Sequence, residues 1–365
     1  MTGVRVRRAL LLLAIAGAQF ALFEIALRAW GHSEAAPAFQ ALFIPDGAIG
    51  YRLRPNARTR FVTSEFDTEI AVNAQGVRDE ANIGPKPANE RRIVVLGDSL
   101  VLSVQVAQQQ TFCKRLEESL NRPGAAVHYR VINAGVQGYG PVEELLFFRQ
   151  VARALQPDLV IETIFVGNDA EEAVRSAPRL RGGTRSQGAA LSDSFITRVR
   201  RLTRRSMVLQ VLRVRAVSVI DRLPRLGTPP EPPLQSYAAD PAPRISEGLR
   251  ISRDCVQAIA TEAAASGART MVMLMPARFQ VDDADYGRLK AAVAGAGGHL
   301  VRDGATARFA DALAPLPLPR FDALPALKAA PSGPDVFFQQ TVHLTPRGHA
   351  IVAEALEAFI RRQGL

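Results

Sequence analysis

The chain has 365 residues, of which 47% are hydrophobic and 22% are charged, so it can bury a sizeable core and is not expected to be disordered. Its formal net charge is +10, and arginine carries nearly all of the positive charge, because only four residues are lysines. A basic balance can indicate nucleic acid or an anionic membrane as a partner. Neither zinc-finger spacing nor an RNA-binding strand accompanies this charge, so we do not expect a nucleic-acid partner.

The N-terminus has the pattern of an export signal. Three arginines, at positions 5, 7 and 8, precede an uncharged run over residues 9–23. A helix over residues 10–29 approaches the ~20 residues that cross a bilayer. We therefore predict a signal anchor over residues 1–32, which holds the protein in the inner membrane with the remainder in the periplasm. Glu24 interrupts the run, and two alternatives stay open: cleavage after residues 16–18, which gives a secreted protein, and an ordinary buried helix.

Residues 33–90 are rich in turn residues and short on helical periodicity. Short strands are expected over residues 51–53, 60–63 and 69–73, separated by Pro-Asn and Gln-Gly turns. This region is predicted to be a small β-rich extension ahead of the main domain.

From residue 91 onward, apolar strands alternate with helices. Strands are expected over residues 93–96, 129–132, 158–165, 270–275 and 321–324, and helices over residues 108–120, 142–155, 246–264 and 348–361. Continuous apolar runs that alternate with helices predict a parallel sheet covered on both faces. The fold class is therefore α/β, a three-layer α/β/α sandwich with a doubly wound sheet, in which ligands bind beyond the carboxyl ends of the strands.

A basic insertion over residues 171–245 interrupts this alternation. Residues 196–226 contain nine arginines against one acid, together with an apolar stripe at helical spacing. The pattern predicts an amphipathic helix or pair of helices. Its arginine face is either simply solvated or forms a lid or membrane-surface element that binds anionic headgroups. A proline-rich linker over residues 228–243 closes the insertion.

Two cysteines, Cys113 and Cys255, are too few and too far apart for a disulfide scaffold or a metal or redox motif. We expect two small buried side chains, although an exported protein permits a single bridge between them. No cluster of His, Asp or Glu has metal-ligand spacing, and phosphate-loop and dinucleotide motifs are absent, so no cofactor is expected.

Ser99 is the first candidate catalytic residue. It ends a Gly-Asp-Ser triplet that follows the expected strand at residues 93–96 and opens a helix. A serine at this point presents its hydroxyl at the sheet edge, where its own amide and the helix dipole are available to an oxyanion. The alternative is a serine that only caps the helix.

Four motifs resemble the sequence blocks of the SGNH (GDSL-like) hydrolases, in the order of that family. They are Val-Leu-Gly-Asp-Ser at 95–99, Asn-Ala-Gly-Val-Gln-Gly at 133–138, Phe-Val-Gly-Asn-Asp at 165–169 and Val-His-Leu-Thr-Pro-Arg-Gly-His at 342–349. The resemblance implies that Ser99 is the nucleophile and that His343 is its general base. It also implies an oxyanion hole made by the amides of Ser99 and Gly138 and by the Asn168 side chain. In isolation, Asn168 could be a turn residue and His343 a buried core histidine.

The chain departs from the family at one position. The family usually carries aspartate three residues before the catalytic histidine, whereas this chain has Gln340. An amide oxygen can accept the histidine N–H but cannot stabilise the imidazolium by charge. The sequence therefore leaves four outcomes open: a slow hydrolase, recruitment of Asp335 as the acid, a Ser-His dyad, or an inactive protein.

Three functions compete. The first is hydrolysis of an acyl or acetyl ester of a carbohydrate, lipid or envelope component through an acyl-serine intermediate. The second is an O-acyltransferase that passes the same acyl group to an exported polysaccharide. The third is a catalytically silent binding protein, which the Gln340 substitution motivates.

Overall fold

The computed structural model describes residues 35–121, 127–182, 234–330 and 336–364, together with residues 7, 15, 17–25 and 208. The chain divides into two compact units. The larger, here called the main unit, comprises Ala35–Arg185 and Pro232–Leu365, and the smaller comprises Met1–Glu34 and Ser186–Glu231. Every strand that the structure describes lies in the main unit.

The centre of the main unit is a five-stranded parallel sheet with the strand order β6-β5-β7-β8-β9. The strands are β5 (Glu90–Gly97), β6 (His128–Gly135), β7 (Leu159–Phe165), β8 (Arg269–Met275) and β9 (Arg320–Asp322). Most of their side chains are buried, because helices cover both faces of the sheet. The predicted parallel α/β sheet is therefore confirmed.

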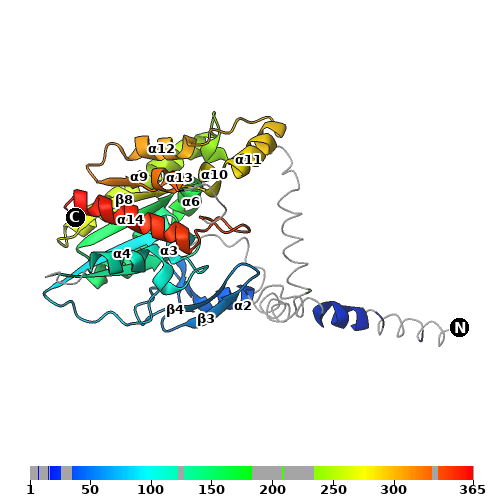
Figure 1. The fold of residues 1–365 in the computed structure, drawn as a ribbon, viewed down its shortest axis with the longest axis horizontal. Helices are drawn as coiled ribbons and strands as arrows, with labels where there is room; N and C mark the ends of the chain where they lie inside the picture. The colour runs from blue at the N-terminus through cyan, green and yellow to red at the C-terminus, as the bar shows by residue number, and fades with distance from the viewer. Residues whose placement is uncertain are drawn as a thin grey trace. The chain divides into compact units, whose positions relative to one another are not determined.

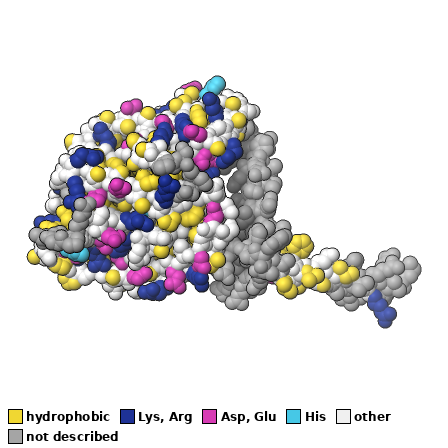
Figure 2. All heavy atoms as spheres, viewed as in Figure 1, with side chains coloured by type: hydrophobic (Ala, Val, Ile, Leu, Met, Phe, Trp, Pro, Cys, Tyr) yellow, Lys and Arg dark blue, Asp and Glu magenta, His cyan; other side chains and the backbone are white. Residues whose placement is uncertain are grey.

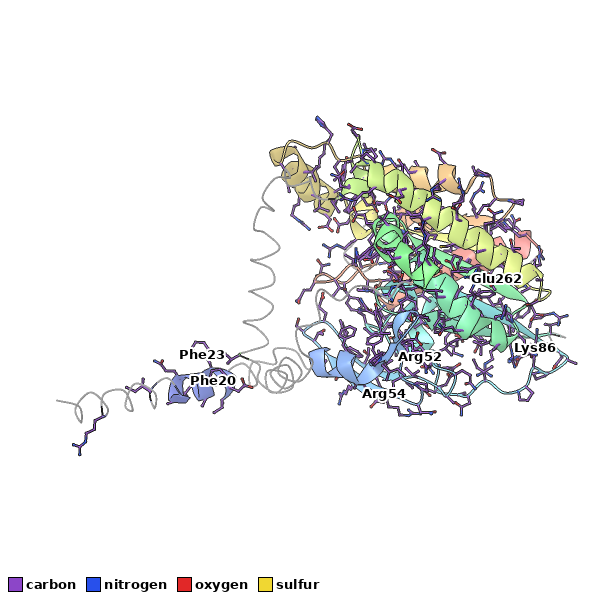
Figure 3. The ribbon with its side chains drawn as sticks, turned by 180° about the vertical axis from the view of Figure 1, so that it is seen from behind. Phe20, Phe23, Arg52, Arg54, Lys86 and Glu262 are labelled. Atoms are coloured by element: carbon purple, nitrogen blue, oxygen red, sulfur yellow. The ribbon has the colours of Figure 1, made fainter. Side chains whose placement is uncertain are left out.

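Helices form a layer on each face of this sheet. One face is covered by α4 (Phe112–Leu120), α13 (Leu324–Ala329) and α14 (Pro346–Arg362), and Figure 1 is seen from the side of α14. The other face is covered by α5 (Pro141–Gln150), α6 (Asp169–Ser176) and α9 (Pro243–Ala264). Figure 3, seen from behind, shows α5 and α9 side by side, where Arg149 and Glu262 form an ion pair of 2.5 Å.

Of the remaining helices, only α11 (Asp283–Gly295) and α12 (Gly304–Leu313) have ten or more residues. The others are α2 (Ala35–Leu42), α3 (Ser99–Leu102) and α10 (Arg278–Val281), with 3-10 turns η1 (Gln108–Gln110), η2 (Ala152–Leu155), η3 (Ala177–Arg181) and η4 (Gln235–Tyr237). Helix α9 begins earlier than the expected residue 246: it starts at Pro243, with Ala242 at the cap position. Proline is favoured at the first helical position because it has no N–H to leave unpaired.

The N-terminal part of the main unit contains two antiparallel hairpins after α2. One pairs β1 (Phe43–Asp46) with β2 (Gly50–Leu53), and the other pairs β3 (Arg58–Val62) with β4 (Asp67–Ala71). The three predicted strands are thus present as β2, β3 and β4. Apolar side chains of the hairpins, including Leu53 and Phe61, are buried in the same core as those of α5 and β5. Residues 35–90 are accordingly packed into the main unit, and Lys86 is tied to Asp158 by an ion pair of 2.6 Å (Lys86 is labelled in Figure 3).

Little of the predicted anchor lies in the described part of the chain. Residues 17–25 are helical, and their apolar side chains are exposed, among them Phe20 and Phe23, which Figure 3 labels. The rest of the anchor, and the amphipathic segment 196–226 apart from Val208, lie outside the described residues. No helix within the described ranges combines the length and the apolar character needed to cross a membrane.

Both cysteines are free thiols in the apolar core, as expected. Burial raises the pKa of Cys113 and of Cys255 to about 12, so neither is a reactive thiolate at neutral pH. On the face that Figure 2 presents, basic and acidic side chains of the main unit are interspersed.

Candidate active site

Ser99 lies where β5 ends and α3 begins. Gly97 makes this turn, and a side chain there would collide with Val101. Asp98, rather than Ser99, caps the helix: its Oδ1 accepts the Leu100 amide at 2.8 Å. The alternative of a helix-capping serine is therefore wrong. The expectation that a helix dipole stabilises an oxyanion at Ser99 is also wrong, because α3 has only four residues and too few aligned peptide units.

The Ser99 hydroxyl faces Asp98 in this structure. Its Oγ lies 3.5 Å from Asp98 Oδ2, which is the outer limit of a hydrogen bond, and the Ser99 residue is 9% exposed. Burial raises the pKa of Asp98 to about 6, against the hydrogen bonds that it accepts. No hydrogen bond joins Ser99 to His343 among the described residues, because neither ring nitrogen of His343 has a partner there.

His343 lies in the loop that precedes α14, and its surroundings keep it neutral. Both ring nitrogens are buried and without a hydrogen-bond partner in the described part of the chain. Burial lowers the pKa of His343 to about 4, so at neutral pH the imidazole is in the form that can accept a proton. Buried polar atoms are nearly always hydrogen-bonded, so an unpartnered imidazole is atypical of a structural core histidine.

His349 illustrates the contrast. It is fully buried in α14, where its Nδ1 accepts the Phe112 amide at 3.2 Å and its ring stacks on that of Phe112. Burial lowers its pKa to about 3. His349 is therefore a structural histidine, with a hydrogen-bond partner and a stacked ring.

The two remaining oxyanion candidates follow the strands on either side of β5. Gly138 comes after β6, has a left-handed φ of 72° and is exposed. A Cβ there would lie 2.9 Å from the Tyr51 hydroxyl, so only glycine fits without strain. Asn168 comes after β7 and opens α6, yet its side chain makes no capping hydrogen bond and its Oδ1 is buried without a partner in the described residues.

The topology places these groups at one edge of the sheet. Strands β6, β5 and β7 are neighbours and parallel, and the register pairs Gly97 at the end of β5 with Gly135 at the end of β6. The carboxyl ends of parallel neighbours share an edge, so Ser99, Gly138 and Asn168 follow strands that end together.

Gln340 does not orient the imidazole in this structure. Its Nε2 donates to the Ser64 hydroxyl at 3.0 Å, in the turn between β3 and β4. Asp335, the other residue considered for the acid position, lies outside the described residues. The described residues therefore provide no acid that is hydrogen-bonded to His343.

A group of four buried carboxyl groups lies behind this edge and was not predicted. Asp98, Glu144, Glu162 and Asp169 are all at most 5% exposed and interact with one another. Burial raises the pKa of Glu162 to about 7 and holds those of Glu144 and Asp169 well above their usual range. The available signal was Glu162 itself, a charged residue inside the apolar run of the expected strand.

This group makes stability fall as pH rises. The folded pKa of Glu162 is about 7 and the unfolded value is about 4.5, so the folded state holds a proton that the unfolded state has released. The resulting stabilisation is present below pH 4.5 and lost as pH rises through 7. Glu162→Gln is therefore expected to gain stability relative to the wild type by on the order of 2 kcal/mol between pH 5 and pH 8.5.

Urea unfolding of both proteins at these two pH values measures this difference. The low pKa values of His343 and His349 act equally in both proteins, so the difference reports Glu162 together with its effect on the pKa values of Glu144 and Asp169. An equal pH dependence in the two proteins would show that Glu162 is ionised in the folded state throughout.

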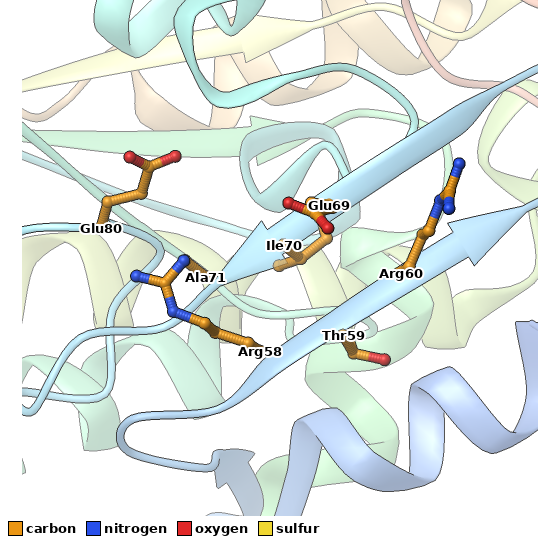
Figure 4. A pocket seen from close by; sticks show the side chains of 7 residues that line it. All are labelled: Arg58, Thr59, Arg60, Glu69, Ile70, Ala71 and Glu80. Atoms are coloured by element: carbon orange, nitrogen blue, oxygen red, sulfur yellow. The ribbon is translucent and has the colours of Figure 1, made fainter.

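A polar hollow of about 200 Å³ lies on the β3–β4 hairpin, away from the candidate residues (Figure 4). It is lined by Arg58, Thr59, Arg60, Glu69, Ile70, Ala71 and Glu80. None of the predicted site residues lines it, and its charges are mixed, so we assign it no part in the chemistry.

Residues 237–365 match a family model described as the SGNH hydrolase-like domain of the acetyltransferase AlgX. The matched segment contains His343 and Gln340, whereas Ser99, Gly138 and Asn168 precede it. No curated protein matches the chain.

Solved structures similar to the chain have low identity. One is TesA, with 13% identity over 74% of this chain and 99% of that chain and a TM-score of 0.42. Another is a lipase/acylhydrolase from Enterococcus faecalis, with 12% identity over 75% of this chain and 96% of that chain and a TM-score of 0.40. A third is the esterase EstA from Pseudoalteromonas sp., with 12% identity over 75% of this chain and 98% of that chain and a TM-score of 0.39. The family match confirms the resemblance to the SGNH hydrolases over residues 237–365, the segment that contains the last of the four motifs.

Proposed function

We propose that this protein is a serine-dependent acyl-transfer enzyme that cleaves an ester through an acyl-Ser99 intermediate, with His343 as the general base. The observation that carries the proposal is the neutral imidazole of His343 in the loop before α14, whose two ring nitrogens are buried and have no hydrogen-bond partner among the described residues. An imidazole in this state is ready to accept the proton of a nucleophile.

The proposed reaction has two halves. Ser99 Oγ attacks the ester carbonyl carbon while its proton passes to His343, and the tetrahedral intermediate then expels the alcohol, which takes that proton from His343. The amides of Ser99 and Gly138 and the side-chain amide of Asn168 would hold the oxyanion. One such donor typically contributes a factor of about 100 to 1,000 in rate.

Hydrolysis of an acyl or acetyl ester on a carbohydrate, lipid or envelope component is the leading function. In that case water, activated by His343, takes the acyl group from Ser99. The second function is O-acyl transfer to an exported polysaccharide, in which a sugar hydroxyl replaces the water. The matched family model, which is named for an acetyltransferase, favours keeping this candidate.

We also propose that residues 1–32 direct export and anchor the protein in the inner membrane, with the remainder in the periplasm. The arginines before residue 9 and the uncharged run over residues 9–23 support it. Fusion of a reporter that is active only outside the cytoplasm, placed after residue 365 with and without residues 1–32, tests it. Reporter activity that does not depend on residues 1–32 would contradict the predicted signal.

Labelling with a fluorophosphonate probe tests the chemistry. We expect the full-length protein to be labelled covalently at Ser99 and the Ser99→Ala variant to remain unlabelled. Equal labelling of the two proteins would refute both enzymatic functions. If Ser99 is labelled, incubation with an acetylated sugar, with and without a second sugar as acceptor, separates release of acetate from transfer of acetate.

A further inference from the structure

The N-terminal hairpins reach two of the loops that carry the candidate catalytic groups. We propose that they form part of the active site, with Glu65 as the positioning residue for His343. This inference rests on the proposed function, because it assigns Glu65 a role in the reaction of Ser99 and His343.

Glu65 binds two consecutive backbone amides of the His343 loop. Its Oε1 accepts the Gln339 amide at 2.7 Å, and its Oε2 accepts the Gln340 amide at 2.9 Å. Both are charge-assisted hydrogen bonds at short distance, which are stronger than neutral ones. A carboxylate that uses both oxygens in this way fixes the direction of the loop as well as its position.

Neighbours of Glu65 strengthen the same contact. Ser64 accepts the Gln340 side-chain amide at 3.0 Å, and the rings of Phe66 and Phe338 pack with their centroids 5.6 Å apart. All three hairpin residues belong to the turn between β3 and β4. The turn therefore contacts the loop through polar and apolar groups together.

The opposite side of the loop is held by Arg278 of α10. Arg278 Nη1 donates to the carbonyl oxygens of Phe338 at 3.0 Å and Gln339 at 2.7 Å, while its Nε donates to Asp285 at 2.5 Å. The loop amides are thus bound by a carboxylate from the hairpin and the loop carbonyls by a guanidinium from α10. Loss of Glu65 would remove both backbone hydrogen bonds from the hairpin side and leave that side held only by the Ser64 and Phe66 contacts.

Tyr51 makes a second, independent contact of this kind. Its hydroxyl donates to the Gln137 carbonyl at 2.7 Å, next to Gly138. In return the Tyr139 hydroxyl donates to the Tyr51 carbonyl at 2.5 Å. The first hairpin therefore supports the loop of an oxyanion candidate while the second supports the loop of the base.

These contacts matter because no described acid is hydrogen-bonded to the His343 ring. In a catalytic triad an aspartate orients the imidazole. Among the described residues, the groups that can orient the imidazole are those that hold the backbone of its loop, Glu65 and Arg278. A displacement of about 1 Å in a catalytic group can cost on the order of 100-fold in rate, so loosening this loop should slow acylation.

The test measures how fast a fluorophosphonate inactivates the full-length protein, with kinact and KI determined separately. We expect Glu65→Ala to lower kinact by about 10- to 100-fold with KI within about twofold of the wild type, because the base is misplaced and the probe still binds. Glu65→Gln, which keeps one accepting oxygen, should recover part of the loss. Glu69→Gln, at an exposed position of β4 in the same hairpin, is the matched control and should behave as the wild type.

Hydrogen exchange of residues 336–345 gives a second readout that does not require activity. Glu65→Ala should exchange the Gln339 and Gln340 amides faster, whereas Glu69→Gln should not. If Ser99 is labelled but Glu65→Ala keeps the wild-type kinact, or if its exchange is unchanged, the positioning role is refuted and the proposed function stands. If Ser99→Ala is labelled as strongly as the wild type, the proposed function itself fails.

Discussion

The His343→Ala variant is expected to acylate Ser99 about 100 to 10,000 times more slowly than the wild type, because it lacks the general base. A serine hydroxyl at its ordinary pKa is a weak nucleophile, and no described side chain other than Asp98 is hydrogen-bonded to it. We expect a slowing near the 100-fold end of this range. No acid in the described part of the chain stabilises the His343 imidazolium, so the contribution of His343 in the wild type is expected to be smaller than in a complete triad.

The pH dependence of acylation distinguishes His343 from Asp98. Because burial lowers the pKa of His343 to about 4, the base form persists down to about pH 5, and the wild-type rate should fall only below that value. Measurement of kinact between pH 4 and pH 8, with circular dichroism to show that the protein stays folded, gives the midpoint. A midpoint near pH 6 that persists in His343→Ala would assign the base role to Asp98, whose pKa is about 6.

The sheet and several candidate residues could be predicted because their signals are local. Strands β5, β7 and β8 appear in the sequence as apolar runs, and the motifs at their ends identify Ser99 and Asn168. Parallel pairing then requires that these ends meet at one edge, without knowledge of any side-chain contact.

The directions of the side chains could not be predicted, because they depend on contacts between distant parts of the chain. Gln340 stands at the position of the usual acid, yet its amide binds Ser64, 276 residues earlier in the sequence. Likewise, Glu144 lies in α5 and Glu162 in β7, and nothing in the sequence indicates that these two side chains are in contact. Their shared burial, and the raised pKa values that follow from it, appear only when α5 packs on the sheet.

Replacement of Arg78 by leucine is expected to destabilise the main unit by about 3 to 5 kcal/mol, since each buried carbonyl left without a donor costs about 1 to 3 kcal/mol. Arg78 is 1% exposed, and its guanidinium donates to the carbonyl oxygens of Leu102 and Ser103 and to that of Val106, at 2.5 to 2.6 Å. These carbonyls form the turn that follows Ser99. Burial lowers the pKa of Arg78 to about 10, so it remains charged at neutral pH.

Urea unfolding of Arg78→Leu and of the control Arg58→Leu measures this effect. Arg58 is exposed on β3, so its replacement should change the free energy of unfolding by less than about 0.5 kcal/mol. Arg78→Lys should fall between the wild type and Arg78→Leu, because one ammonium group cannot reproduce the planar fork that reaches three carbonyls. A loss below about 1 kcal/mol in Arg78→Leu would mean that the turn after Ser99 rearranges to satisfy its own carbonyls. In that case residues 35–90 do not hold the turn after Ser99 in place. Their contribution to the site is then limited to the two loops that Tyr51 and Glu65 contact.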